Sequence, residues 1–304
     1  MHRILTLGLF LVGGAALAGA QQAPRVWTIQ ELFQRNVGST EQQNKQFPPH
    51  KIIGNVYYVG TESLSSFLVT TPEGHILINS IFERNAPVIQ DSMRKLGFKF
   101  EDIKIVVGSH AHGDHMEGDG LIVKLTGARA MAMAEDIPAL QAMRSPGGYP
   151  RPAYEALRDG SEVKLGGVVL TARHTPGHTA GCTTWTLRAQ EGGRSYDVLI
   201  IGSVGVNPGT NLVGNPQLVA QYQQSFKFLR SARVDVPLGS HPGMYNMAEK
   251  YAKLSSGGPN PYIDPKGFLD EITIQETAFN NELKRQQVEG PPPPRGGARR
   301  GAPN

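Results

Sequence analysis

The chain has 304 residues, of which 39% are hydrophobic, enough to bury the core of one large domain or two small ones. Its 30 basic and 26 acidic residues give a formal charge of +4. Residues 1–20 and 291–304 contribute four arginines and no acidic residue, so the segment between them has a formal charge of zero. A neutral core gives no electrostatic basis for binding nucleic acid, and we expect no nucleic-acid partner.

The first twenty residues have the pattern of a secretory signal peptide. Arg3 is followed by an apolar run over 4–17 and by the small residues Ala18-Gly19-Ala20. The run is short and broken by glycine, which argues against a membrane anchor. We therefore predict that residues 1–20 are removed and that the mature protein is periplasmic or secreted, with no membrane association. The single cysteine, Cys182, allows no internal disulfide.

The first half of the chain begins with a polar N-terminal extension over 21–50, in which we expect a short helix at 29–35. Short β-rich runs then predict strands, and apolar residues at helical spacing predict a helix. The strands are expected at 56–59, 66–70, 75–79 and 103–107, and the helix at 86–96. Further helices are expected from near Met116 and over 134–143, and the Gly- and Pro-containing segment 144–160 predicts a surface loop.

The second half repeats this alternation of strands and helices. Strands are expected at 168–172, 183–187, 198–201 and 234–238, and helices at 218–229, 246–254 and 267–286. The Pro-, Gly- and Arg-rich segment 288–304 cannot bury apolar surface and predicts a disordered tail. Two groups of strands with accompanying helices indicate an α/β domain over 51–287, in which two packed sheets carry helices on their outer faces.

A cluster of possible metal ligands directly follows the buried strand at 103–107. The run His110-Ala111-His112-Gly113-Asp114-His115 offers four ligands within six residues. Imidazole nitrogen and carboxylate oxygen suit zinc, and a set without thiolates is not typical of purely structural sites. One loop cannot complete two tetrahedral sites, so further ligands must come from other parts of the chain.

Two later histidines occupy similar places in the sequence. His178 and His241 each lie in a glycine-containing loop after a predicted strand, where α/β sheets assemble their sites. We interpret these residues and the cluster together as a zinc site with one or two ions. His50 and His75 are interpreted as structural, whereas His174 either is structural or orients a ligand.

At these residues the chain resembles the metallo-β-lactamase superfamily, and the likeness extends from about residue 57 to 286. This resemblance implies a four-layer αββα sandwich. The motif does not select the substrate, because the superfamily includes thioesterases, lactonases, phosphodiesterases and β-lactamases. Two features resemble subclass B3 of the β-lactamases: Ser203 replaces a metal-bridging aspartate, and His115 stands where subclasses B1 and B2 have arginine. Segments 214–216 and 260–265 also resemble that subclass.

The resemblance assigns a role to each candidate residue. It implies two zinc ions, the first held by three histidines and the second by a carboxylate and two histidines. Asp114 would also orient the nucleophile as a catalytic residue, and Ser203 would help hold a substrate carboxylate. The implied ligands are His110, His112 and His178 for the first ion, and Asp114, His115 and His241 for the second.

Three positions depart from the family pattern. Asn79 stands where the superfamily usually has an aspartate that supports the metal loop, so the loss of charge is expected to lower metal affinity. Gly205 replaces a second serine and weakens the expected binding of a carboxylate. Cys182 stands where serine is usual and is interpreted as a small buried residue.

The resemblance implies hydrolysis of the β-lactam amide bond by a metal-bound hydroxide, without a covalent acyl-enzyme, and hence antibiotic resistance. The substrate would be a small molecule, and we assume a monomer. Two alternatives remain open. One is an exported zinc hydrolase that acts on another ester, lactone or amide and turns over β-lactams weakly. The other is a zinc-binding protein without catalytic activity.

Overall fold

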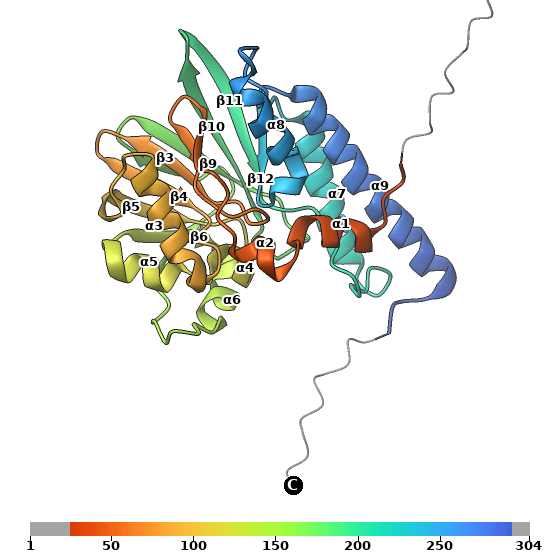
Figure 1. The fold of residues 1–304 in the computed structure, drawn as a ribbon. Helices are drawn as coiled ribbons and strands as arrows, with labels where there is room; N and C mark the ends of the chain where they lie inside the picture. The colour runs from red at the N-terminus through yellow and green to blue at the C-terminus, as the bar shows by residue number, and fades with distance from the viewer. Residues whose placement is uncertain (1–24, 294–304) are drawn as a thin grey trace, which may run out of the picture.

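The structure is a computed structural model that describes residues 25–293. Two β-sheets lie face to face, and helices cover the outer face of each (Figure 1). This is the four-layer αββα sandwich that the resemblance implied. The predicted signal peptide at 1–20 and the end of the predicted tail, 294–304, lie outside the described residues.

The first sheet has seven strands whose order in the sheet follows their order in the chain. The strands from β1 to β4 pair antiparallel, and those from β4 to β7 pair parallel. Their bounds are β1 His50–Ile53, β2 Val56–Tyr58, β3 Phe67–Thr71, β4 Gly74–Ile78, β5 Ile103–Val107, β6 Arg129–Met133 and β7 Tyr154–Leu157.

The second sheet has five strands in the order β12-β11-β10-β9-β8. All neighbours pair antiparallel except β11 and β12, which are parallel. Their bounds are β8 Glu162–Leu165, β9 Val168–His174, β10 Thr183–Glu191, β11 Arg194–Ile201 and β12 Val236–Gly239.

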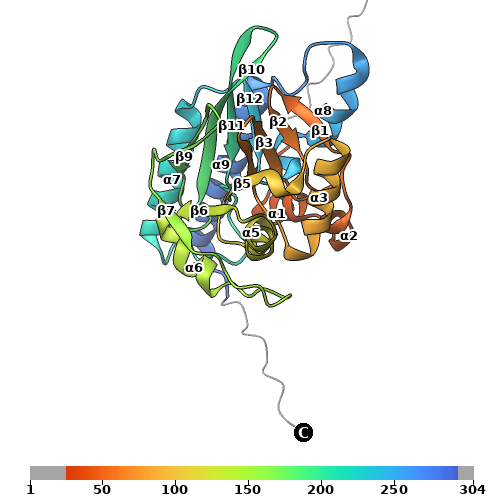
Figure 2. The same ribbon diagram turned by 90° about the vertical axis from the view of Figure 1, so that its left-hand side faces the viewer.

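Helices on both sides complete the layers. Figure 2 shows α3 and α5 on the outer face of the first sheet and α7 and α9 behind the second. Among the described helices, α9 is the longest, and none is long and apolar enough to cross a membrane. The helix bounds are α1 Ile29–Val37, α2 Thr40–Asn44, α3 Ala86–Lys95, α4 Gly113–Met116, α5 Asp119–Thr126, α6 Ile137–Ala142, α7 Pro216–Ser231, α8 Met247–Lys253 and α9 Pro265–Glu289.

Alternation along β4 shows how the sequence builds these layers. Ile76 and Ile78 belong to the core that the two sheets share with Trp185. Leu77, between them, belongs to the core under α3, together with Ile89 of that helix. Successive side chains of a strand point to opposite faces, so a fully apolar strand buries both of its faces.

The N-terminal extension folds as two capped helices, which confirms the helix predicted there. Thr28 accepts from the backbone N–H of Glu31, and the Glu31 carboxylate accepts from the backbone N–H of Thr28. Ser39 and Gln42 repeat this capping box at the start of α2. Such reciprocal bonds satisfy backbone donors that the helix itself leaves unpaired, so α1 begins at a defined position.

Several predicted boundaries were wrong. The helix expected from near Met116 starts earlier: α4 begins at Gly113, inside the metal-ligand run, and α5 follows at Asp119. Strands β1, β6, β7 and β8 were not predicted, and β7 lies in the segment expected to be a loop. Helix α9 continues to Glu289, two residues into the segment expected to be a disordered tail.

Candidate metal centre

The candidate ligands lie where strands of both sheets end. β5 ends at Val107, just before the motif, and β12 ends at Gly239, just before His241. β9 ends at His174, four residues before His178. The structure brings these loops together at one edge of the sandwich, so all six predicted ligands gather in two groups of three.

The first group consists of three histidines, His110, His112 and His178. Their ligand atoms all lie within 4.8 Å of one another, and His112 Nδ1 lies 3.2 Å from His178 Nε2. The ring centroids are 4.5 to 4.9 Å apart. Three imidazole nitrogens that converge in this way can coordinate one metal ion.

The second group adds a carboxylate to two histidines. Asp114 Oδ2 lies 3.3 Å from His115 Nε2 and 3.6 Å from His241 Nε2. The rings of His110 and His115 are 4.2 Å apart, so the two groups are neighbours. We call the six residues together the ligand floor.

Unpaired buried atoms support a metal in the ligand floor. Both ring nitrogens of His110 and of His115 are buried and have no hydrogen-bond partner. Buried polar groups nearly always have a partner, because an unpaired one costs about 1–3 kcal/mol. Coordination would satisfy a nitrogen on each ring, and the nitrogen and oxygen donors are those that zinc prefers. The residues present therefore fit a metal centre.

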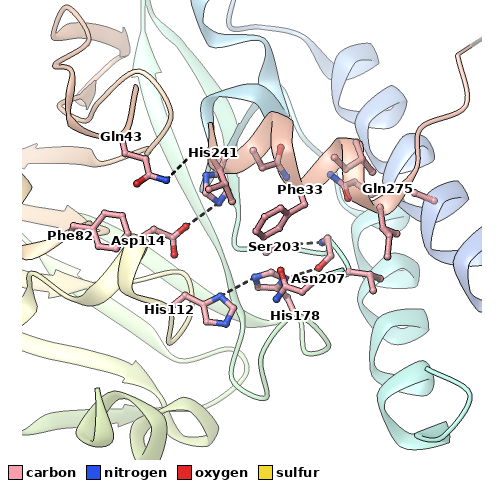
Figure 3. A pocket seen from close by; sticks show the side chains of 17 residues that line it. Phe33, Gln43, Phe82, His112, Asp114, His178, Ser203, Asn207, His241 and Gln275 are labelled. Carbon is pink, nitrogen blue, oxygen red and sulfur yellow. Dashed lines mark hydrogen bonds and ion pairs between the residues drawn. The ribbon is translucent and has the colours of Figure 1, made fainter. Parts of the chain in front are cut away.

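Backbone carbonyls fix which nitrogen of two histidines is available. His178 Nδ1 lies 2.6 Å from the Gly205 carbonyl oxygen, and His241 Nδ1 lies 3.1 Å from that of Ser63. A carbonyl oxygen can only accept, so each Nδ1 carries the proton and donates it. Nε2 is left as the ligand atom on both rings, and Figure 3 shows His178 and His241 facing the cavity.

Burial keeps the imidazoles in the form that binds metal. It lowers the pKa of His115 to about 3 and that of His178 to about 4, and neighbouring histidines add to both effects. The pKa of His110 is held well below its usual value for the same reasons. Burial raises the pKa of Asp114, but the adjacent His115 and His241 outweigh it, so the pKa is lowered overall. Neutral imidazoles and an ionised carboxylate are the coordinating forms.

Asn79 supports the start of the metal-ligand run. Its Oδ1 accepts from the backbone N–H of Ser109 at 2.8 Å, and its Nδ2 donates to the Ser65 carbonyl at 3.2 Å. Asn79 has φ +67°, a conformation that asparagine adopts more readily than most residues. Asparagine thus keeps the bond to the ligand loop and adds one to Ser65 that an aspartate could not donate.

Asp136 links two ligand loops, and the sequence analysis missed it. Its Oδ2 accepts from the Ala111 N–H and the Thr179 hydroxyl, both at 2.8 Å, and its Oδ1 accepts from the Gly181 N–H at 2.7 Å. The carboxylate is 3% exposed. Asp136 therefore ties the loop of His110 and His112 to the loop that carries His178. Nothing in its local sequence indicates this role.

The remaining histidines and the cysteine lie outside the ligand floor. His174 Nε2 contacts the Ala180 carbonyl at 2.7 Å and touches no candidate ligand. His50 pairs with the Tyr262 hydroxyl at 2.7 Å, and His75 packs against the Phe98 ring, as expected of structural histidines. Cys182 is fully buried, and burial raises its thiol pKa well above the usual value.

A cavity of about 330 Å³ opens above the ligand floor. His112, Asp114, His178 and His241 line one side of it, together with Ser203 (Figure 3). The opposite side is formed by α1 and α9, a contribution that the sequence analysis did not predict. We call this side the helical wall; it consists of Ile29, Leu32, Phe33, Asn36 and Val37 of α1, and Gln275 and Ala278 of α9.

Comparisons with known proteins place the chain in a family. Residues 59–241, more than half of the chain, match the Metallo-beta-lactamase superfamily. The chain therefore belongs to this superfamily, and the matched segment contains all six residues of the ligand floor.

Solved structures narrow the likeness. Native FEZ-1 metallo-beta-lactamase from Legionella gormanii is 45% identical, with a TM-score of 0.76 over 81% of this chain and 98% of that one. BJP-1 of Bradyrhizobium japonicum, a subclass B3 metallo-beta-lactamase, is 34% identical, with a TM-score of 0.76 over 83% and 99%. The chain is thus similar over 81% and 83% of its length to two metallo-β-lactamases, one of them of subclass B3.

Curated relatives match a shorter stretch and have other activities. The human mitochondrial persulfide dioxygenase ETHE1 is 29% identical over 43% of this chain and 45% of its own length. A hydroxyacylglutathione hydrolase from Pseudomonas aeruginosa is 36% identical over 25% of each chain. The chain spans less than half the length of these relatives.

Proposed function

We propose that this protein hydrolyses the amide bond of β-lactams with two zinc ions in the ligand floor, as subclass B3 metallo-β-lactamases do. The observation that carries the proposal is the identity of the residue that lines the cavity just after strand β11. Ser203, not an acidic residue, lines the cavity beside two complete three-residue ligand groups. The similarity to FEZ-1 over 98% of that chain supports the same reading.

The two ligand groups divide the work of binding and orientation. Bound zinc supplies a Lewis acid and lowers the pKa of a coordinated water to about 7. Asp114 Oδ2 lies 3.3 Å from His115 Nε2 and 3.6 Å from His241 Nε2. Its carboxylate would therefore hold the second zinc ion with these two histidines and would also orient the attacking water. Asp136 and the Gly205 carbonyl hold the loops and rings in position.

Ser203 is proposed to bind the substrate. Its side chain is 4% exposed and lies at the cavity, where its Oγ accepts from the Gly205 N–H at 3.3 Å. The hydroxyl proton is then free to point to an acceptor such as the carboxylate of a β-lactam. No nucleophilic serine is needed for the reaction, so we expect no acyl-enzyme intermediate.

Location, assembly and biological role remain part of the proposal. We propose that the protein is exported to the periplasm or secreted, acts as a monomer without nucleic-acid partners, and gives its host resistance to β-lactam antibiotics. The similarity to FEZ-1 and BJP-1, both metallo-β-lactamases, supports the proposed role in resistance.

Activity assays with matched histidine variants test the function. Purified zinc-loaded protein is expected to hydrolyse nitrocefin and a carbapenem, and a chelator should abolish the turnover until zinc is restored. His178→Ala is expected to be inactive, whereas His174→Ala, four residues away and outside the ligand floor, should retain activity. A host that expresses the intact gene should show raised resistance, and the His178→Ala gene should not confer it.

Assays of thioesters and lactones beside the β-lactams separate the alternatives. A zinc-loaded protein that cleaves thioesters or lactones but no β-lactam would replace the proposal with the other hydrolase function. Bound zinc with no turnover of any of these substrates would indicate a binding protein.

A further inference from the structure

An unpaired acceptor in the helical wall is not explained by the metal chemistry. Gln275 of α9 lines the cavity and is 2% exposed. Its Oε1 has no hydrogen-bond partner. A buried amide oxygen without a donor destabilises the folded protein, so its retention in a cavity wall indicates that a ligand can satisfy it.

An ion pair between α1 and α9 sets the direction of this oxygen. Arg35 donates to both carboxylate oxygens of Glu271, at 2.9 and 2.5 Å. Glu271 Oε1 also accepts from Gln275 Nε2 at 2.7 Å. A carboxylate paired with arginine can only accept, so the amide nitrogen of Gln275 must face Glu271. Gln275 Oε1 therefore points away from Glu271.

Gly205 leaves space in front of this oxygen. A Cβ atom at Gly205 would lie 3.6 Å from Gln275 Oε1 and 3.8 Å from Ser203 Oγ, and residues other than 204–206 place no further heavy atom within 4 Å of it. A ligand group that lies over Gly205 can thus reach one hydrogen-bond donor and one hydrogen-bond acceptor. The Ser203 hydroxyl can donate to an acceptor, and Gln275 Oε1 can only accept from a donor.

We propose that Gln275 is a specificity-determining residue that accepts a hydrogen bond from a donor on the substrate, such as the side-chain amide N–H of an acylamino β-lactam. This inference rests on the proposed β-lactamase function. Gln275 forms no contact with the ligand floor among the described interactions, so its role is to select and orient substrates. Arg35 and Glu271 are positioning residues that act through Gln275.

Two penicillins test the inference with the zinc-loaded protein. Benzylpenicillin carries an amide N–H at position 6, whereas penicillanic acid has no substituent there. Gln275→Met keeps the size and apolar stem of the side chain but removes the acceptor. We expect kcat/KM for benzylpenicillin to fall about five- to twentyfold, mainly through KM, and that for penicillanic acid to change less than about twofold.

Gln286→Met is the matched control. Gln286 lies on the same helix, is 1% exposed and uses its Oε1 to accept from Leu212 N–H, away from the cavity. Its loss should lower the melting temperature without separating the two substrates. If Gln275→Met lowers kcat/KM equally for both penicillins, the proposed role of Gln275 is overturned. If the wild-type protein hydrolyses neither penicillin, the proposed function fails and this assignment fails with it.

Gly205→Ser gives a readout that does not depend on turnover. A serine there can donate to Gln275 Oε1 from within the protein, so it should raise the melting temperature in the wild-type background. In the Gln275→Met background the same change should have no such effect. An equal effect in both backgrounds would show that the oxygen is not an available acceptor, and would overturn the inference.

Discussion

The ligand floor and the helical wall face each other across one cavity but are built in different ways. The residues of the floor follow the ends of three strands, β5, β9 and β12, and carbonyl and carboxylate groups of the interior hold the side chains and their loops in place. The wall consists of two helices, α1 and α9, joined by the Arg35–Glu271 ion pair. Changes in the floor should therefore alter the reaction itself, whereas changes in the wall should alter which substrates bind.

The largest effect should follow the loss of a ligand from the floor. His110→Ala removes an imidazole that is 2% exposed and has no other partner. Because the metal supplies several kcal/mol of transition-state stabilisation, kcat/KM should fall about 10³-fold or more, and zinc content should drop. His75→Ala, a buried histidine outside the floor, is the control. If His110→Ala keeps its full zinc content and activity, the ligand floor is not the part of the cavity that carries out the reaction.

A smaller effect is expected one contact away from the metal. Asp136→Asn keeps the shape but replaces an acceptor oxygen with an amide that cannot accept from Ala111, Thr179 and Gly181 together. Loss of such support typically lowers metal affinity about 10–100-fold. Competition with a chromophoric chelator measures this. Asp159→Asn, an exposed carboxylate that accepts from His174 N–H, should leave zinc affinity unchanged.

Asn79→Asp tests whether charge or hydrogen bonding matters at the base of the floor. An aspartate would set an acceptor against the Ser65 carbonyl, where Asn79 now donates. We expect the free energy of unfolding of the zinc-free protein to fall by about 1–3 kcal/mol in urea titrations. Asn55→Asp, which breaks a similar bond to the Thr70 carbonyl at a partly exposed position, should cost less. If the stability of Asn79→Asp is unchanged and its zinc binding is tighter, the charge at position 79 matters more than the hydrogen bond to Ser65.

The smallest effect should come from the wall. Phe33 of α1 lines the cavity and is 38% exposed, so it offers apolar surface to a substrate. Phe33→Ala should raise KM about three- to tenfold, because about 1 kcal/mol of apolar contact is lost, and leave kcat within about twofold. Leu125→Ala, on α5 and 52% exposed, is the control. A large fall in kcat would show that Phe33 affects the reaction itself, as the residues of the ligand floor do, and not only substrate binding.

The sequence analysis anticipated the floor far better than the wall. His110, His178 and His241 each follow a strand with a clear apolar pattern, and strand ends of a sheet meet at one edge. The residues of the wall lie on helices whose spacing predicts a buried face but not what that face covers. Gln275 and Asp136 owe their roles to contacts with residues distant in the chain, which no local pattern records.

The missed strands have a similar cause. β6 reads Arg-Ala-Met-Ala-Met, and alanine and methionine favour helices, so pairing with β5 overrides the local preference. β7 lies at the edge of its sheet with two exposed residues, next to a segment rich in glycine and proline. Edge strands with such flanks have little alternation to indicate them.

The ion pair between Arg35 and Glu271 has a consequence for biosynthesis. It joins the first described helix to the last, 236 positions later in the chain. All residues of the ligand floor have been translated once His241 has left the ribosome, but the opposite side of the cavity is incomplete until α9 has also been translated. Capacity to coordinate metal should thus arise before capacity to discriminate among ligands, and nascent chains arrested before residue 265 would separate the two.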